Sequence, residues 1–140
     1  MKQLLFLITL LMSFNVLANP VCDFPYDLSE ESGVRELSTK QITPSTRFSS
    51  LQKLQIIESA KRILRDNRLP VPRGMRLQDA INELTLDSEG GDAYLNIFRF
   101  KGIVYTEIVY YPGGNPYGYV FKGSRVVARR TDGDLLCDGI

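Results

Sequence analysis

A tyrosine-rich stretch, YTEIVYYPGGNPYGYVF at residues 105–121, carries the strongest structural signal in the chain. Two runs of β-branched and aromatic residues flank a Pro-Gly-Gly-Asn-Pro loop at residues 112–116. Such runs favour strands, and a short loop of proline, glycine and asparagine favours a chain reversal. The stretch therefore predicts a β-hairpin. An isolated hairpin is barely stable in water, so we place this one at the centre of a small antiparallel sheet.

Two tighter turns extend the hairpin into a meander. Lys101-Gly102 forms a two-residue turn, and Gly123-Ser124 places glycine first, as a type II′ turn requires. The sequence thus predicts strands at residues 93–100, 103–111, 117–122 and 125–131. A short segment at 134–137 either pairs with the last strand or docks beside it.

Two helices precede the predicted sheet. Ser49 or Ser50 caps the first, which runs to about residue 66 with apolar residues at three- and four-residue steps. The second spans about residues 76–86, and prolines between the two prevent a continuous helix. The predicted fold is α+β, with two helices packed on one face of a four-stranded antiparallel β-meander and one disulfide.

The first 18 residues have the features of a secretory signal peptide. Lys2 precedes an apolar run that ends at small residues, and we expect cleavage after Ala18. The run is too short for a stable membrane span, and no transmembrane segment is expected after cleavage. The protein is therefore expected to be exported, to the periplasm or outside the cell. Cys22 and Cys137 both belong to the exported part, and an oxidising compartment favours one disulfide between them.

We expect residues 19–48 to form an extended N-terminal arm, with a short strand or a helical turn around residues 33–38. This arm makes one unit with the α+β domain at residues 49–140.

Composition excludes several classes of function. The net charge of +1 falls to zero without Lys2, so no overall field attracts nucleic acid, which is an unlikely partner. The absence of histidine removes the usual catalytic triads and dyads. We expect neither a cofactor nor a metal, and the sequence does not indicate an oligomeric state.

Counting outward from the turns predicts strand register and sorts the side chains onto two faces. In this register Asn96 lies opposite Glu107, Tyr111 lies opposite Tyr117, and Val109 lies opposite Tyr119. One face, which carries Val120 and Tyr110, is mostly aliphatic and suits the helices. The other, which carries Phe121, is rich in aromatic residues and is covered by the N-terminal arm, by a ligand or by a second copy of the chain. The candidate binding residues on this aromatic face and at the hairpin tip are Asn96, Tyr105, Glu107, Tyr111, Asn115, Tyr117, Tyr119 and Arg130.

These features favour an exported, non-enzymatic binding protein, of which an inhibitor is one form. It would recognise a protein or a small ligand through the hairpin tip at residues 112–116 and the aromatic face. One alternative is a small hydrolase or lyase centred on Glu107, although a structural pair with Asn96, Arg99 or Arg130 also explains that carboxylate. Another alternative is an accessory subunit of an envelope assembly that uses the basic run from Lys61 to Arg76.

Overall fold

Local sequence signals define both helices as predicted. The computed structural model describes residues 33–137, with helix α2 at Ser50–Asp66 and helix α3 at Leu77–Asp87. Ser49 caps α2: its Oγ accepts the Gln52 N–H at 3.2 Å, and the Gln52 side chain accepts the Ser49 N–H at 2.9 Å. This reciprocal pair satisfies two backbone donors that a helix N-terminus otherwise leaves open. At the start of α3, the Asp79 carboxylate accepts the Arg76 N–H at 3.1 Å.

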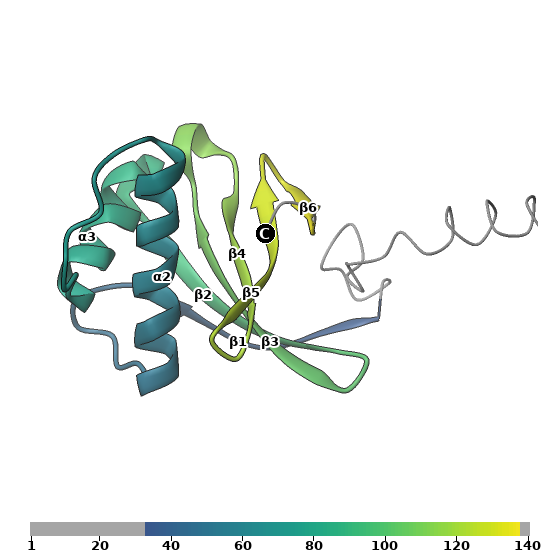
Figure 1. Ribbon diagram of the computed structural model, residues 1–140. Coiled ribbons are helices and arrows are strands. Elements are labelled where there is room, and N and C mark those ends of the chain that lie inside the picture. The colour runs from purple at the N-terminus through teal and green to yellow at the C-terminus, as the bar shows by residue number, and fades with distance from the viewer. Residues whose placement is uncertain (1–32, 138–140) are drawn as a thin grey trace, which may run out of the picture.

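The sheet has six antiparallel strands in the order of the sequence, and the two helices lie together on one of its faces (Figure 1). The strands are β1 (Val34–Gln41), β2 (Ala93–Phe100), β3 (Ile103–Tyr110), β4 (Tyr117–Lys122), β5 (Arg125–Thr131) and β6 (Asp134–Leu136). Short 3-10 turns, η2 (Glu89–Gly91) and η3 (Pro112–Gly114), lie before β2 and between β3 and β4.

The prediction of a four-stranded meander was wrong, because a strand is added at each edge of the sheet. Strand β1 forms within the segment assigned to the extended arm and pairs antiparallel with β2, with a bulge between Glu36 and Ser38. Only its first residue is buried, so its sequence lacks the alternation that marks a strand. Strand β6 pairs with β5 after a turn in which Asp132 and Gly133 both have positive φ.

One half of the predicted disulfide lies outside the described residues. Cys137 is buried next to the sheet, but Cys22 belongs to the part of the chain that precedes residue 33. The signal peptide at 1–18 and most of the predicted arm, at 19–32, also lie outside the described residues.

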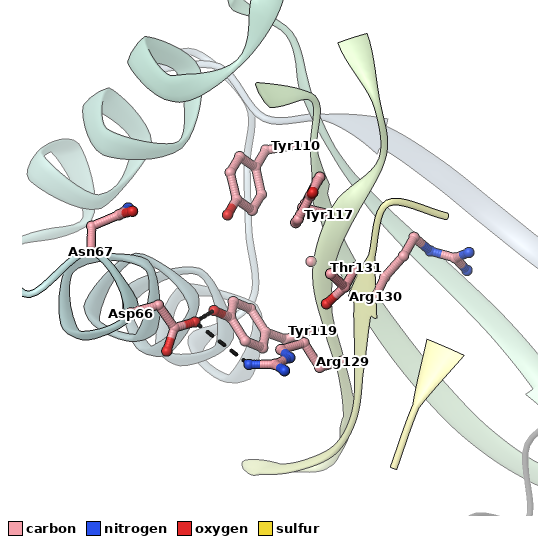
Figure 2. Close-up of a pocket in the computed structure, with 9 residues that line it drawn as sticks. Asp66, Asn67, Tyr110, Tyr117, Tyr119, Arg129, Arg130 and Thr131 are labelled. Atoms are coloured by element: carbon pink, nitrogen blue, oxygen red, sulfur yellow. Dashed lines mark hydrogen bonds and ion pairs between the residues drawn. The ribbon is translucent and has the colours of Figure 1, made fainter. Parts of the chain in front are cut away.

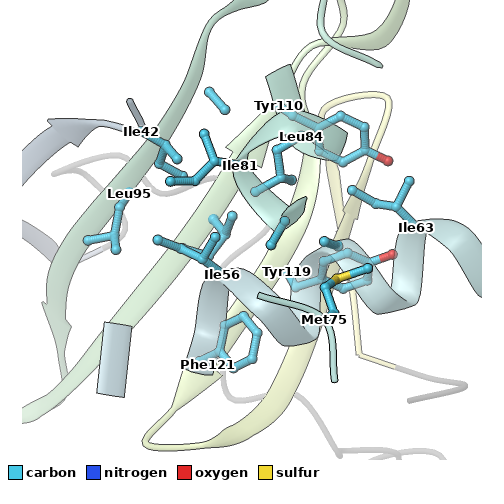
Figure 3. Close-up of a cluster of buried hydrophobic side chains, with 14 of the residues drawn as sticks. Ile42, Ile56, Ile63, Met75, Ile81, Leu84, Leu95, Tyr110, Tyr119 and Phe121 are labelled. Carbon is cyan, nitrogen blue, oxygen red and sulfur yellow. The ribbon is translucent and has the colours of Figure 1, made fainter. Parts of the chain in front are cut away.

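The main core lies between the helices and the sheet (Figure 3). Ile56 and Ile63 of α2 and Leu84 of α3 pack there against Leu95 and Phe121 of the sheet, and all five side chains are almost fully buried. A second cluster lies on the opposite face, where Phe98 and Tyr105 stack with ring centroids 5.5 Å apart. The sheet thus buries apolar side chains on both faces.

The predicted register was correct between β2 and β3 but wrong by one residue between β3 and β4. Asn96 lies opposite Glu107 as expected, whereas Tyr117 pairs with Tyr110 and not with Tyr111. The reason is that both backbone groups of Tyr111 are bonded elsewhere. Its N–H donates to Ser88 Oγ at 2.9 Å, and its carbonyl accepts the N–H of Glu89 at 2.8 Å.

This one-residue shift moves three predicted members of the aromatic face to the helix side. Tyr117, Tyr119 and Phe121 pack with the main core, next to Tyr110, which was correctly predicted to face the helices. Val120, predicted on the helix side, packs instead in the second cluster. Side chains alternate along a strand, so a slip of one position exchanges the two faces.

Gly118 sets how closely β3 and β4 approach. A Cβ at this position would lie 1.9 Å from the carbonyl oxygen of Ile108 and 3.1 Å from Cα of Val109. Both atoms belong to backbone, which cannot turn away as a side chain would. We predict that Gly118→Ala lowers the free energy of unfolding by about 3 kcal/mol, measured by urea denaturation.

Gly123→Ala is the matched control for this prediction. Gly123 has a φ of +60° with open space around its missing Cβ, so alanine there carries only the cost of the left-handed backbone, about 1 kcal/mol. Equal losses in the two variants would contradict a specific close approach at Gly118.

Candidate functional site

A cavity of about 350 Å³ opens where the C-terminal end of α2 faces strands β3, β4 and β5 (Figure 2). We call it the tyrosine cleft. Its lining residues are Asp66, Asn67, Tyr110, Tyr117, Gly118, Tyr119, Arg129, Arg130 and Thr131. The volume lies at the lower end of the range typical of small-molecule sites.

Strand register brings the three tyrosines together. Tyr110 and Tyr117 are direct partners across β3 and β4, and their ring centroids are 6.2 Å apart at 51°. Tyr119 follows two positions along β4, so its side chain points to the same face. Gly118 lies between them without a side chain. The result is an aromatic wall built on paired strands, which hold its position more firmly than a loop would.

Two charged residues complete the cleft. The Tyr119 hydroxyl donates to Asp66 Oδ2 at 2.9 Å, and Arg129 Nη1 lies 4.0 Å from the same oxygen. Their side chains are about half exposed, at 53% for Asp66 and 43% for Arg129. A pair this long and this exposed contributes little to stability. Both groups therefore remain available to hydrogen-bond a molecule that enters the cleft.

The buried phenols stay neutral well above physiological pH. Burial raises the pKa of Tyr110 to about 12, and the negative charges of Asp87 and Asp66 act in the same direction. Burial, together with the hydrogen bond to Asp66, also raises the pKa of Tyr119. Neither hydroxyl is activated as a base or nucleophile. Each offers a neutral hydroxyl that both donates and accepts hydrogen bonds.

Glu107, the candidate catalytic carboxylate, is bound to Arg130. Arg130 Nη2 donates to Glu107 Oε2 at 2.9 Å and Arg130 Nε to Oε1 at 3.3 Å, while Nη1 donates to the Gly133 carbonyl at 2.8 Å. Glu107 is 3% exposed. Burial raises its pKa, and the guanidinium opposes that shift. Both carboxylate oxygens are engaged, as the structural interpretation of Glu107 predicted.

The structure separates the eight predicted binding residues. Tyr117, Tyr119 and Arg130 line the tyrosine cleft, although the guanidinium of Arg130 points away from the tyrosines (Figure 2). Glu107 lies on the other face of the sheet, opposite Asn96 in register. The remaining predicted residues also lie away from the cleft: Tyr105 stacks on Phe98, Tyr111 meets Tyr94 edge to face, and Asn115 is exposed in the hairpin loop.

Sequence reasoning missed Asp66 and Arg129. One signal for Asp66 was present: it ends a helix, where the helix dipole disfavours a carboxylate. A negative charge at that position suggests a partner from elsewhere in the fold, which here is the Tyr119 hydroxyl. Arg129 carried no such signal, because its face depends on the register of β5 and on a bulge in the β4–β5 pair.

The basic run splits into two parts. Glu58 forms ion pairs with Arg62 at 3.1 Å and with Arg65 at 3.6 Å. Arg68, Arg73 and Arg76 are exposed beyond the end of α2. Paired cations on a helix surface are a common solvated arrangement.

Comparison of the chain with protein-family models, with curated proteins and with solved structures finds no match. Within residues 33–137, no helix is long and apolar enough to cross a membrane. No group of three or more histidine, cysteine, aspartate or glutamate side chains lies close enough to hold a metal ion in the same part of the chain.

The raised pKa of Tyr110 predicts a loss of stability at high pH. Between pH 10 and about 12 the unfolded chain releases this proton while the folded chain keeps it, so the free energy of unfolding falls. We expect Tyr110→Phe to remove about 2 kcal/mol of that fall by pH 12, measured by urea denaturation across this range. Below about pH 9 the difference in the free energy of unfolding between the original chain and Tyr110→Phe should not change with pH. Parallel stability curves up to pH 12 would contradict the assignment.

The buried ion pair predicts a non-additive pair of substitutions. Glu107→Leu leaves the Arg130 guanidinium buried without its counter-charge, so the free energy of unfolding should drop by about 3 kcal/mol. A double variant, Glu107→Leu with Arg130→Met, removes both charges and should recover most of that loss. Urea denaturation of Glu107→Leu, of Arg130→Met and of the double variant measures the coupling between the two side chains. Additive losses would show that the two side chains do not depend on each other.

Proposed function

We propose that this chain is an exported, non-enzymatic binding protein that holds a small, neutral, hydroxyl-rich ligand in the tyrosine cleft. The observation that carries the proposal is the lining of one cavity by three tyrosines and by the Asp66–Arg129 pair. Export is a prediction from residues 1–18, which lie outside the described residues.

The charge balance of the cleft favours a neutral ligand. Asp66 and Arg129 contribute one charge of each sign, and burial keeps the phenols of Tyr110 and Tyr119 protonated. An ion that enters the cleft would be attracted by one of these two side chains and repelled by the other. A ligand with many hydroxyl groups, such as a sugar or polyol, can instead accept from Arg129, donate to Asp66 and exchange hydrogen bonds with the phenols.

The ring faces supply the apolar part of recognition. Tyrosine offers a broad apolar surface with a polar tip and loses little side-chain entropy when it makes a contact. Tyr117 is half-buried and thus presents part of its ring to the cavity. A saccharide ring has an apolar face of carbon-bound hydrogens and a rim of hydroxyls, which matches an aromatic wall beside polar side chains.

The structure supports a small ligand better than insertion of the hairpin tip into a partner. Both ends of the tip are bonded to neighbouring loops, through Tyr111 on one side and through the Pro116 carbonyl, which accepts the Gly133 N–H at 3.0 Å, on the other. An inserting loop would have to project away from such neighbours. The hydrolase alternative is weakened because Arg130 occupies both oxygens of Glu107.

The test is titration of the protein with a panel of monosaccharides, disaccharides and polyols, monitored by NMR of the tyrosine ring signals. We expect saturable shifts of Tyr110, Tyr117 and Tyr119 with at least one member of the panel. Tyr117→Leu should weaken that binding by about tenfold, because it removes an aromatic contact of roughly 1 kcal/mol or more. Asp66→Asn should weaken it too, through loss of a charge-assisted acceptor.

Tyr94→Leu is the matched control, since Tyr94 lies outside the cleft on the other face of the sheet. It should leave affinity for the same ligand unchanged. Shifts confined to residues outside the cleft, or equal weakening by Tyr94→Leu and Tyr117→Leu, would overturn the proposal.

A further inference from the structure

A second cavity lies on the other side of the hairpin tip. It has a volume of about 580 Å³, and its lining residues are Glu89, Asp92, Tyr94, Tyr111 and Gly114. We call it the acidic pocket. It shares no lining residue with the tyrosine cleft, so an inference about it does not rest on the function proposed above.

Hydrogen bonds fix the frame of the acidic pocket. The buried Ser88 hydroxyl accepts the Tyr111 N–H at 2.9 Å and donates to the Asp92 carbonyl. The Glu89 N–H donates to the Tyr111 carbonyl at 2.8 Å. The loop that carries both carboxylates is thereby joined to the strand end that carries one of the rings. Little ordering is left for a ligand to impose when it binds.

The two rings form walls that meet nearly at a right angle. The centroids of Tyr94 and Tyr111 are 6.1 Å apart, and the ring planes are inclined by 80°. Aromatic faces carry partial negative charge and attract cations within about 6 Å of the centroid. Aromatic rings that line one cavity are also the basis of the aromatic cages that surround quaternary ammonium groups in proteins.

The carboxylates in the pocket lack a cationic partner among the described residues. Ion pairs within residues 33–137 use Glu58, Asp66 and Glu107, and none uses Glu89 or Asp92. Asp92 Oδ1 accepts from the Gln41 side-chain amide at 2.9 Å, which is neutral and leaves the negative charge uncompensated. No lysine or arginine lines the cavity, so it carries two formal negative charges.

Gly114 brings one carboxylate against the hairpin tip. A Cβ at this position would lie 3.1 Å from Glu89 Oε2, and Gly114 has a φ of +83°. The absence of a side chain therefore lets the Glu89 carboxylate lie over the tip backbone, at the edge of the cavity that the rings line.

The donor set fits an organic cation better than a metal ion. Calcium takes six to eight oxygen ligands as a rule, and two carboxylates beside two aromatic rings do not provide them. An alkylammonium group uses both features at once, because its charge meets the carboxylates and its methyl or methylene groups contact the ring faces. We infer that the acidic pocket binds an alkylammonium group, with Tyr94 and Tyr111 contacting its carbon atoms and Glu89 and Asp92 balancing its charge.

The test compares tetramethylammonium and choline with dimethylbutanol, the neutral carbon isostere of choline. Each is titrated into the full chain, with the ring signals of Tyr94 and Tyr111 followed by NMR. We expect saturable binding of both cations and binding of the neutral isostere weaker by about tenfold or more. Added sodium chloride should weaken the binding of the cations, because salt screens carboxylates that are partly exposed to solvent. It should leave the binding of the neutral isostere unchanged.

Variants assign the two contributions. Tyr94→Leu should weaken the binding of tetramethylammonium by about tenfold, whereas Tyr94→Phe, which keeps the aromatic face, should bind it as tightly as the original chain does. Glu89→Gln should weaken the binding of both cations and reduce the salt dependence of that binding. Tyr117→Leu, which alters the tyrosine cleft and no residue of the acidic pocket, should leave the affinity for both cations unchanged.

Equal affinity for choline and its neutral isostere would overturn the inference, and so would the absence of saturable binding by tetramethylammonium. Loss of sugar binding in the cleft with ammonium binding retained would overturn the proposed function alone. The two proposals therefore fail separately.

Discussion

The hydrogen bond between Ser88 and Tyr111 determines the arrangement of the tyrosines. It joins residues 23 positions apart, at the end of α3 and the end of β3, and the neighbouring Glu89 N–H bonds to the carbonyl of the same tyrosine. With both backbone groups occupied, Tyr111 cannot pair with β4, and the ladder between β3 and β4 starts one residue earlier. A buried, satisfied polar group is costly to disturb, so this contact holds the register firmly.

That register places two chemically different cavities on either side of one loop. Tyr110 and Tyr117 turn toward the helices and form a cleft whose charges cancel, while Tyr111 turns the other way and joins Tyr94 and two carboxylates. The adjacent tyrosines Tyr110 and Tyr111 therefore serve opposite faces of the sheet. A register shifted by one residue would pair Tyr111 with Tyr117 and put both on one face, so the separation of the two cavities depends on this contact.

Local features were predictable from the sequence, and features that depend on distant contacts were not. Ser49 and Gln52 mark the start of α2, and the two-residue turn at Lys101-Gly102 fixes the register of β2 on β3, because each signal lies within a few residues of its effect. The sequence indicated only a short strand or a helical turn around residues 33–38, because the stability of strand β1 comes from pairing with β2 more than fifty residues later, not from alternation in its own sequence. Tyr117 and Tyr119 were predicted on the wrong face of the sheet, because the register of β4 depends on the hydrogen bond between Ser88 and Tyr111. Of the predicted binding residues, Tyr117, Tyr119 and Arg130 line the tyrosine cleft, whereas the charged residues Asp66 and Arg129 of the same cleft were not predicted.

The buried pair of Glu107 and Arg130 secures the other end of the same hairpin loop. Arg130 reaches the Gly133 carbonyl, and the Gly133 N–H bonds to the Pro116 carbonyl, so Glu107 is linked through two further residues to the end of the tip. The tip is thus held at Tyr111 by the loop before β2 and at Pro116 by the turn before β6. A buried ion pair adds little net stability compared with apolar packing, and its best-supported benefit is geometric definition. Glu107, the most conspicuous carboxylate in the sequence, therefore has a structural role, because it fixes the position of the loop that separates the two cavities.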